Sequence, residues 1–215
     1  MSKDQSAVET YKYFSSLVGN QHKASEFALS FVNNLIGKFQ IKSVLELGLG
    51  IGSICYSVHE FCNRNAMNIK YIGTESNPFC LSVLPKYLNK YFKTIEIHPN
   101  LKHVPKGHRF DLVIVDGQEE SLEKVSSLTA QQGIVLIEGD RLPQLEVIRK
   151  IFPKAKYARV ISIYKNPVYG PFSSKHWCGG VQLVFIRPTF NQKLYYYNLK
   201  FSTAIKYKLR KLINK

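Results

Sequence analysis

The chain has 215 residues, of which 45% are hydrophobic and 13% aromatic, enough for one folded domain with a sizeable core. It carries 30 basic and 15 acidic residues, a net charge of +15. No apolar run approaches the ~20 residues that a membrane span requires, and the polar start predicts no signal peptide. The four cysteines have no C-x-x-C spacing, so we expect free thiols and a cytoplasmic protein.

The predicted elements alternate between helices and strands along the chain. Residues 4–39 have helical periodicity and predict one or two amphipathic helices that end near Gly37. The expected strands are 42–47, 69–74, 94–98, 111–116, 133–138, 157–164 and 180–187, and the expected helices between them are 53–65, 77–91, 119–129 and 143–152. This alternation predicts right-handed βαβ units and a parallel sheet. The last two strands are joined by a long loop without a helical pattern, so we expect that pair to be antiparallel.

The first expected strand runs into a glycine-rich segment, Glu46–Gly52, with the sequence E-L-G-L-G-I-G. Glycine is needed where the backbone turns tightly or approaches a ligand without a Cβ. A strand that turns in this way into a helix forms a nucleotide-type site at the carboxyl edge of a parallel sheet. The segment resembles motif I of the class I S-adenosylmethionine (AdoMet)-dependent methyltransferases. A dinucleotide-binding loop would have its third glycine one residue later, where this chain has Ser53.

The resemblance covers roughly residues 40–188 and implies the fold of that family. The fold is α/β: a three-layer αβα sandwich around a mostly parallel seven-stranded sheet of order 3-2-1-4-5-7-6, with the last strand antiparallel. The chain then divides into an N-terminal helical cap (1–40), an AdoMet-dependent methyltransferase domain (41–190) and a basic, aromatic C-terminal tail (191–215). In the family pattern, Gly48, Gly50 and Gly52 let the backbone approach the methionine part of AdoMet, and Glu46 helps to hold its amino end.

Two further positions match the cofactor side of the family pattern. Glu75 ends the second strand, where the family places the acid that binds the two ribose hydroxyls, and Ser76 follows it. A carboxylate can accept both hydrogen bonds of a vicinal diol, although a dinucleotide fold also has an acid here. Ser76 is also a plausible N-cap of the next helix. Asn100 follows the third strand, where the family places adenine contacts, but Pro-Asn is ordinary turn sequence as well.

The ends of the fourth and fifth strands carry the candidates for the reaction itself. Asp116, in the sequence V-D-G, resembles the small-molecule O-methyltransferase branch, in which this acid faces the transferred methyl group. Catechol-type members hold Mg²⁺ with this acid and an Asp-Asn pair after the fifth strand, where the present chain has Gly139 and Asp140. Asp116 with Asp140 or Glu138 can bind a hard cation through oxygen ligands, or accept the proton of an acceptor hydroxyl. The sequence leaves Mg²⁺ dependence open.

The loop 166–180 and the tail complete the set of expected functional segments. His176 lies among aromatic residues in the loop and is a third candidate for a catalytic base, because histidine titrates near neutrality. The tail contains basic residues interleaved with aromatic ones, no acid follows Glu146, and residues 201–213 are expected to form a helix. Such a helix can lie on an anionic membrane, contact nucleic acid phosphates, or pack on its own domain.

These observations favour an AdoMet-dependent methyltransferase that acts on a hydroxyl of a small or glycan-type acceptor and releases S-adenosylhomocysteine. The enzyme would be cytoplasmic, with the tail as a peripheral contact to the inner face of the membrane. Two alternatives stay open. One is an RNA or DNA methyltransferase that uses the basic C-terminal third, although the chain lacks the Asn/Asp-Pro-Pro-aromatic tetrapeptide after strand four. The other is a non-catalytic AdoMet-binding domain or an NAD-type Rossmann domain.

Overall fold

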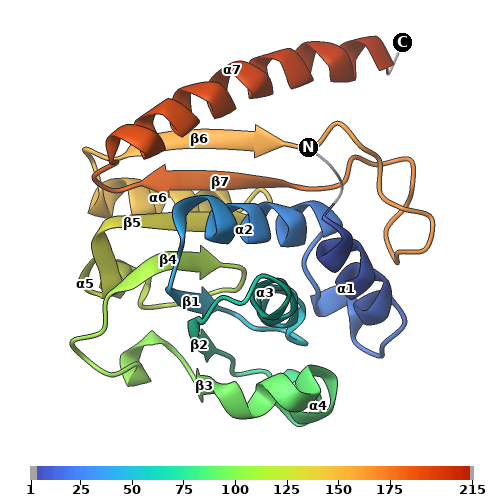
Figure 1. The fold of residues 1–215 in the computed structure, drawn as a ribbon, viewed down its shortest axis with the longest axis vertical. Coiled ribbons are helices and arrows are strands. Elements are labelled where there is room, and N and C mark those ends of the chain that lie inside the picture. Colours follow the sequence, from blue (N-terminus) through green and yellow to red (C-terminus); the bar gives the residue numbers. More distant parts are fainter. Residues whose placement is uncertain (1–3, 214–215) are drawn as a thin grey trace.

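The computed structural model describes residues 4–213 and contains a single seven-stranded sheet (Figure 1). The strands are β1 (Ser43–Leu47), β2 (Lys70–Thr74), β3 (Ile95–His98), β4 (Phe110–Val115), β5 (Thr129–Glu138), β6 (Lys156–Ile161) and β7 (Gly180–Phe185). Their order in the sheet is β3-β2-β1-β4-β5-β7-β6. The first five strands pair in parallel, and β7 runs antiparallel to both β5 and β6. The predicted fold class, strand order and antiparallel last strand are confirmed.

Helices cover both faces of this sheet and produce the expected three layers (Figure 1). They are α1 (Gln5–Ser15), α2 (Glu26–Phe39), α3 (Ser53–Arg64), α4 (Pro78–Leu88), α5 (Val125–Leu128), α6 (Leu142–Ile151) and α7 (Phe190–Ile213). Side chains of α2 and α3 pack with one set of strand residues, and those of α5 and α6 pack with the alternate set. Val44 and Leu45, for example, belong to opposite faces, because successive strand residues point in opposite directions.

The N-terminal segment forms two helices, each with a side-chain cap at its start. Asp4 accepts hydrogen bonds from the backbone of Ser6 and Ala7, and Ser25 accepts one from Ala28. Such caps satisfy backbone N–H groups that have no partner within the helix. Helix α2 ends at Phe39, which is the end of the predicted helical range 4–39 and two residues beyond Gly37.

Two helices differ in length from the predicted ones, and the N-cap of a third helix is a different residue from the one expected. The stretch predicted as a helix over 119–129 contains only a 3₁₀ turn, Leu122–Lys124, and the single turn of α5, because β5 already starts at Thr129. Helix α4 is capped by the side chain of Asn77, not by Ser76. The predicted 201–213 helix is part of α7, which begins at Phe190 and runs along β6 at the end of the sheet (Figure 1).

Candidate active site

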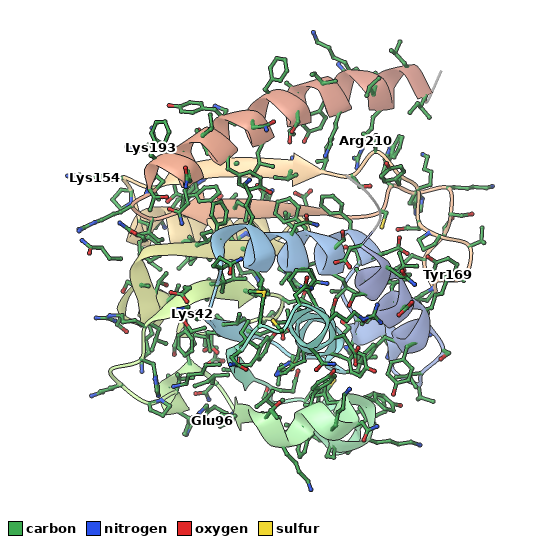
Figure 2. The ribbon with its side chains drawn as sticks, in the orientation of Figure 1. Lys42, Glu96, Lys154, Tyr169, Lys193 and Arg210 are labelled. Carbon is green, nitrogen blue, oxygen red and sulfur yellow. The ribbon has the colours of Figure 1, made fainter. Side chains whose placement is uncertain are left out.

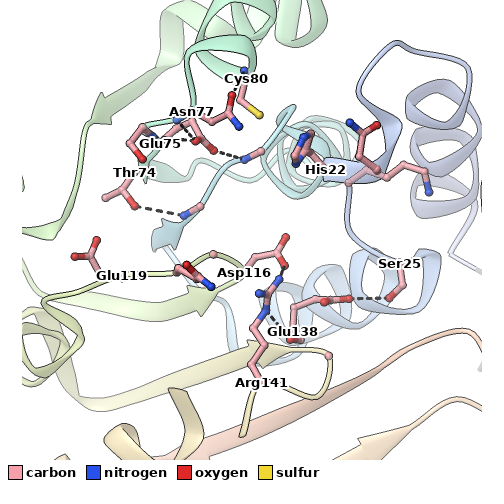
Figure 3. Close-up of a pocket in the computed structure, with 18 of the residues that line it drawn as sticks. His22, Ser25, Thr74, Glu75, Asn77, Cys80, Asp116, Glu119, Glu138 and Arg141 are labelled. Atoms are coloured by element: carbon pink, nitrogen blue, oxygen red, sulfur yellow. Dashed lines mark hydrogen bonds and ion pairs between the residues drawn. The ribbon is translucent and has the colours of Figure 1, made fainter. Parts of the chain in front are cut away.

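A cavity of about 1220 Å³ opens at the carboxyl ends of β1, β2, β4 and β5 (Figure 3). Parallel α/β sheets bind their ligands at this edge, because the strand-to-helix loops there converge around the point where strand order reverses. Here that point lies between β1 and β4. The cavity is therefore the place where the glycine-rich segment and the acid of the fourth strand meet.

The glycine-rich turn after β1 is held by β2 and by close backbone contacts. The carbonyl oxygen of Thr74 accepts hydrogen bonds from the N–H groups of Gly48 and Leu49, at 3.0 and 2.9 Å. Gly48 has φ +87°, and a Cβ there would lie 2.6 Å from the Cα of Gly117. Gly50 has φ +53°, and its Cβ would lie 2.2 Å from the carbonyl oxygen of His22. Both glycines are thus required by the fold of the chain itself, and both line the cavity.

Glu75 lies at the rim of the cavity with its carboxylate fixed by backbone donors (Figure 3). Its Oε2 accepts from Gly50 at 2.7 Å, and its Oε1 accepts from Ser76 and Asn77 at 2.8 and 2.7 Å. An ionised carboxylate offers about four acceptor positions, so acceptor capacity remains for a ligand. Ser76 and Asn100, the other two predicted cofactor residues in this region, also line the cavity.

Glu46 and Gly52, by contrast, do not line the cavity. The carboxylate of Glu46 is buried behind the glycine turn, where the hydroxyl of Tyr71 donates to its Oε2. Its Oε1 is buried without a hydrogen-bond partner among the described residues. Burial raises the pKa of Glu46 well above its usual range. Gly52 caps α3 and faces Leu84 and Leu88, so its role in the structure is local packing.

Asp116, Glu138 and Arg141 form a charged cluster on the opposite wall of the cavity (Figure 3). Arg141 donates from Nη2 to Oδ1 of Asp116 at 2.9 Å and from Nε to the carbonyl oxygen of Glu138 at 3.1 Å. Ser25, at the start of α2, donates to the Glu138 carboxylate at 3.1 Å. Burial, together with the neighbouring Glu138 charge, raises the pKa of Asp116 above its usual range, although Arg141 opposes that shift.

Asp140 does not join this cluster. Its carboxylate is paired with Arg159 at 2.8 Å, its side chain is 66% exposed, and it is not among the residues that line the cavity. Gly139, with φ +71°, turns the chain after β5, and Arg141 rather than Asp140 then reaches Asp116. The sequence did not point to Arg141, because the family pattern directs attention to acids at this strand end.

The residues present do not fit a magnesium site. Within residues 4–213, no three His, Cys, Asp or Glu side chains are grouped so that they can hold a metal ion. One oxygen of Asp116 is already taken by the guanidinium of Arg141, and a fixed positive charge beside a carboxylate repels a cation. Asp140, the second expected ligand, is turned towards Arg159.

The loop between β6 and β7 and the loop before α2 close the cavity from the side. Phe172, His176 and Trp177 of the first loop line it, and so does Lys23 of the second. Lys23 is only 6% exposed, and its Nζ lies 3.1 Å from the centre of the Tyr11 ring without a hydrogen-bond partner among the described residues. Burial lowers its pKa to about 7. Nothing in the linear sequence marked Lys23, because its burial depends on α1 and on the distant loop.

The cavity wall is acidic although the chain as a whole is strongly basic. Its acidic members are Glu75, Asp116, Glu119, Glu120 and Glu138, and its lysines and arginines are Lys23, Lys102 and Arg141. Above about pH 8, the raised pKa of Asp116, such a wall attracts a cationic ligand and disfavours a polyanion at the same place. The site therefore combines a glycine turn, a fixed carboxylate at the second strand and a charged cluster at the fourth and fifth strands.

Comparisons with known proteins find similar folds but no similar family model or curated sequence. Neither the protein-family models nor the curated protein sequences contain a match to this chain. Among solved structures, an O-methyltransferase from Bacillus cereus in complex with SAH superposes with a TM-score of 0.59 at 13% identity, covering 86% of this chain and 92% of that one.

Two other solved structures illustrate the range of proteins with this fold. The O-methyltransferase TomG from Streptomyces achromogenes, in complex with SAM, has a TM-score of 0.59 at 12% identity, with 85% and 90% of the two chains covered. The tRNA (m1A58) methyltransferase TrmI from Aquifex aeolicus has a TM-score of 0.62 at 16% identity, with 84% and 76% covered. Together with the strand order, these likenesses show that the chain has the Rossmann-like fold of the class I AdoMet-dependent methyltransferases.

Proposed function

We propose that this protein is an AdoMet-dependent methyltransferase that methylates a hydroxyl group of a small or glycan-type acceptor. The observation that carries the proposal is the cavity in which Gly48, Gly50 and Glu75 face Asp116 across the β1–β4 switch point. The first three residues suit the methionine and ribose parts of AdoMet, and Asp116 suits the reacting end. The structures with this fold that hold SAH or SAM support the same cofactor.

The cofactor half of the site fits AdoMet chemically. The carboxylate of Glu75 is fixed by backbone donors and keeps capacity for a ribose hydroxyl. Glu46 lies behind the glycine turn and outside the cavity wall, so we propose that it supports the turn without touching the ligand. The acidic wall suits the positive charge of a sulfonium. Asn100 and Ser76 remain proposed cofactor contacts.

The reaction half supplies alignment and a proton acceptor. When bound, AdoMet supplies a methyl group on a sulfonium sulfur; the acceptor oxygen forms the new C–O bond as the S–C bond breaks. In-line transfer depends first on holding the acceptor oxygen in reach. Arg141 fixes Asp116 at 2.9 Å, so that the second oxygen of this carboxylate is free to accept the hydroxyl proton. His176 and Lys23 line the same cavity and are further candidates to accept a proton.

The acceptor is proposed to be small, and several observations support this choice over nucleic acid. The acidic residues around the cavity oppose the approach of a phosphate backbone. The aromatic side chains of Phe172 and Trp177 in the cavity wall suit the face of a sugar or an aromatic ring. Asp140, an expected catalytic residue and metal ligand, has no part in this proposal because it lies outside the cavity.

We also propose a cytoplasmic location, because Cys55, Cys62, Cys80 and Cys178 are all free thiols. None of the helices within residues 4–213 is both long and apolar enough to cross a bilayer.

The experiment that tests the proposal is a transfer assay with isotope-labelled AdoMet and a panel of acceptors. The panel contains free and nucleotide-linked sugars, catechols, their amine analogues and bulk tRNA, and mass spectrometry locates the added methyl group. Methylation of a hydroxyl compound is the expected result, and it should be lost in Asp116→Asn. Methylation of tRNA alone, or of amines alone, would refute the proposed acceptor class.

A further inference from the structure

Helix α7 turns a stripe of large apolar side chains away from the domain (Figure 2). The stripe is defined here as Phe190, Leu194, Tyr197, Phe201, Ile205 and Leu212, all of which are exposed. These positions recur at intervals of three, four and seven, so that at about 3.6 residues per turn they fall on one side of the helix. Phe190 is 80% exposed and Phe201 is 70% exposed. Large apolar side chains gathered on one exposed helix face mark a site of interaction.

The opposite side of α7 fixes the helix in this orientation. Gln192, Tyr196, Leu199 and Thr203 are buried against the domain. Gln192 donates from Nε2 to the carbonyl oxygen of Gln132 at 3.0 Å at one end of the helix. At the other end, Arg210 donates from Nε to the carbonyl oxygen of Ser162 at 2.7 Å. The helix cannot rotate to bury the stripe without breaking both contacts and leaving buried polar groups unpaired.

Basic side chains accompany the stripe along the whole helix. Lys193, Lys200 and Lys211 are exposed along one flank, and Lys208 is exposed within the arc of the stripe. Lys193 and Lys211 are 18 positions apart (211 − 193), which at about 3.6 residues per turn places them on the same side. No acidic residue follows Glu146, so no carboxylate on α7 neutralises these charges. The surface is therefore both apolar and cationic.

Of three possible partners for α7, namely a second copy of the helix, a nucleic acid and an anionic bilayer, the apolar and cationic surface fits the bilayer best. A second copy of α7 would cover the apolar stripe, but it would bring lysines of both copies together with no acid on either helix. A nucleic acid would neutralise the lysines, but it would leave the aromatic and aliphatic side chains in water. An anionic bilayer satisfies both features: apolar side chains enter the boundary between headgroups and acyl chains, and flanking lysines meet the lipid phosphates.

We propose that the outer face of α7 is an interfacial membrane-binding surface specific for anionic lipids. The helix would lie in the plane of the bilayer surface, with its stripe inserted and its axis parallel to the membrane. The proposal does not depend on the reaction that the cavity performs. The carboxyl end of α7 contacts the loop that closes the cavity, since Arg210 lies 4.6 Å from the centre of the Trp177 ring. Membrane binding by α7 would therefore place the bilayer beside that loop.

The test is co-sedimentation of the full chain with vesicles of phosphatidylcholine, with and without phosphatidylglycerol. The stripe variant is Leu194→Ser/Phe201→Ser/Leu212→Ser, and the charge variant is Lys193→Gln/Lys200→Gln/Lys211→Gln. The control for the charge variant is Lys86→Gln/Lys106→Gln/Lys124→Gln, which removes three exposed lysines that lie outside α7. Asn191→Ser/Asn198→Ser is the control on α7 itself. All of these positions are exposed, and thermal unfolding would verify that each variant is folded.

The full chain should sediment with anionic vesicles, not with neutral ones, and 1 M salt should release it, since the Debye length is then about 3 Å. The charge variant should lose about a hundredfold in partition coefficient, and the stripe variant more than about tenfold. Both controls should bind like the wild type. The proposal would be overturned if the stripe variant kept its binding, or if neutral vesicles bound the protein equally. It would also be overturned if the stripe substitutions converted a stable dimer into a monomer in sedimentation velocity.

Discussion

The guanidinium of Arg141 and the carboxylate of Asp116 lie 2.9 Å apart on one wall of the cavity, with Arg141 also anchored to the backbone of Glu138. The side chain of Asp116 is 14% exposed, so this pair is largely shielded from solvent. Arg141 stabilises the charged form of Asp116, whereas burial and the nearby Glu138 disfavour it, and the net effect is a raised pKa. A carboxylate in this state accepts a proton more readily than an exposed one, which is what a base for a hydroxyl acceptor requires.

The substitution Asp116→Asn should reduce kcat by about 10²- to 10⁴-fold, because it removes the proton acceptor while keeping the shape of the side chain. Binding of S-adenosylhomocysteine should change much less, since Gly48, Gly50 and Glu75 remain. Steady-state kinetics with an acceptor found in the panel, combined with calorimetry, would separate the two effects. Full activity of this variant would rule out Asp116 as the base.

The substitution Arg141→Gln should move the acid limb of the pH–rate profile to higher pH. Arg141 lowers the pKa of Asp116, so its loss should raise that pKa, by about 1–3 units for a close carboxylate–arginine pair. The wild type should lose activity below about pH 8, the raised pKa of Asp116, and the variant should lose it at a correspondingly higher pH. The matched control is Arg159→Gln, which removes the partner of Asp140 outside the cavity and should leave the profile unchanged. An unshifted acid limb in Arg141→Gln would argue against Asp116 as the titrating group.

Glu75→Gln should weaken binding of S-adenosylhomocysteine by at least about tenfold, because a neutral amide replaces an acceptor of charge-assisted hydrogen bonds. Glu96→Gln is the control, since Glu96 lies on the edge strand β3, pairs with His98 and does not line the cavity. Isothermal titration calorimetry would measure both variants. Equal affinities for the two would show that Glu75 does not contact the ligand.

Lys23→Met should stabilise the protein most below about pH 7, and the gain should shrink as the pH rises towards 10.5. The folded-state pKa of Lys23 is lowered from 10.5 to about 7, so the folded state bears a cost for the buried charge at low pH. Between these values the unfolded chain binds more protons than the folded one, and stability of the wild type rises with pH. The gain should be on the order of a few kcal/mol at most.

Urea unfolding of wild type and variant at a series of pH values would measure this difference. Lys12→Met is the control, because Lys12 is exposed but likewise lies over an aromatic ring, that of Tyr169. A stability difference that does not vary with pH would contradict the lowered pKa of Lys23.

The strands and their order followed from the sequence because local signals agreed with the global pattern. Short apolar segments, separated by helical stretches, predicted the strands. The glycine turn after Leu47 predicted that a ligand site lies at the carboxyl edge of the sheet. The stretch 119–129 is predicted as a helix because it lies between two expected strands, but Thr129 already pairs with Phe110 in the sheet. Pairing between strands can override a weak helical preference, and sequence periodicity alone does not report that competition.

The chemistry at the end of β5 was harder to predict for a geometric reason. The resemblance to catechol-type methyltransferases places Asp140 beside Asp116, but the chain turns at Gly139, which has a positive φ, and Arg141 contacts Asp116 instead. The sequence also did not predict which side of α7 faces outward. Lys208 falls within its apolar arc, and periodicity does not say which side of a helix meets the domain when inward positions such as Gln192 are polar.

The most direct test of the account is calorimetric titration of the purified protein with S-adenosylhomocysteine and, separately, with NAD⁺. We expect micromolar binding of S-adenosylhomocysteine and no heat of binding with NAD⁺, because we propose that the glycine turn and Glu75 hold the methionine and ribose parts of AdoMet. Binding of NAD⁺ in the absence of any binding of S-adenosylhomocysteine would contradict the proposed function at its foundation.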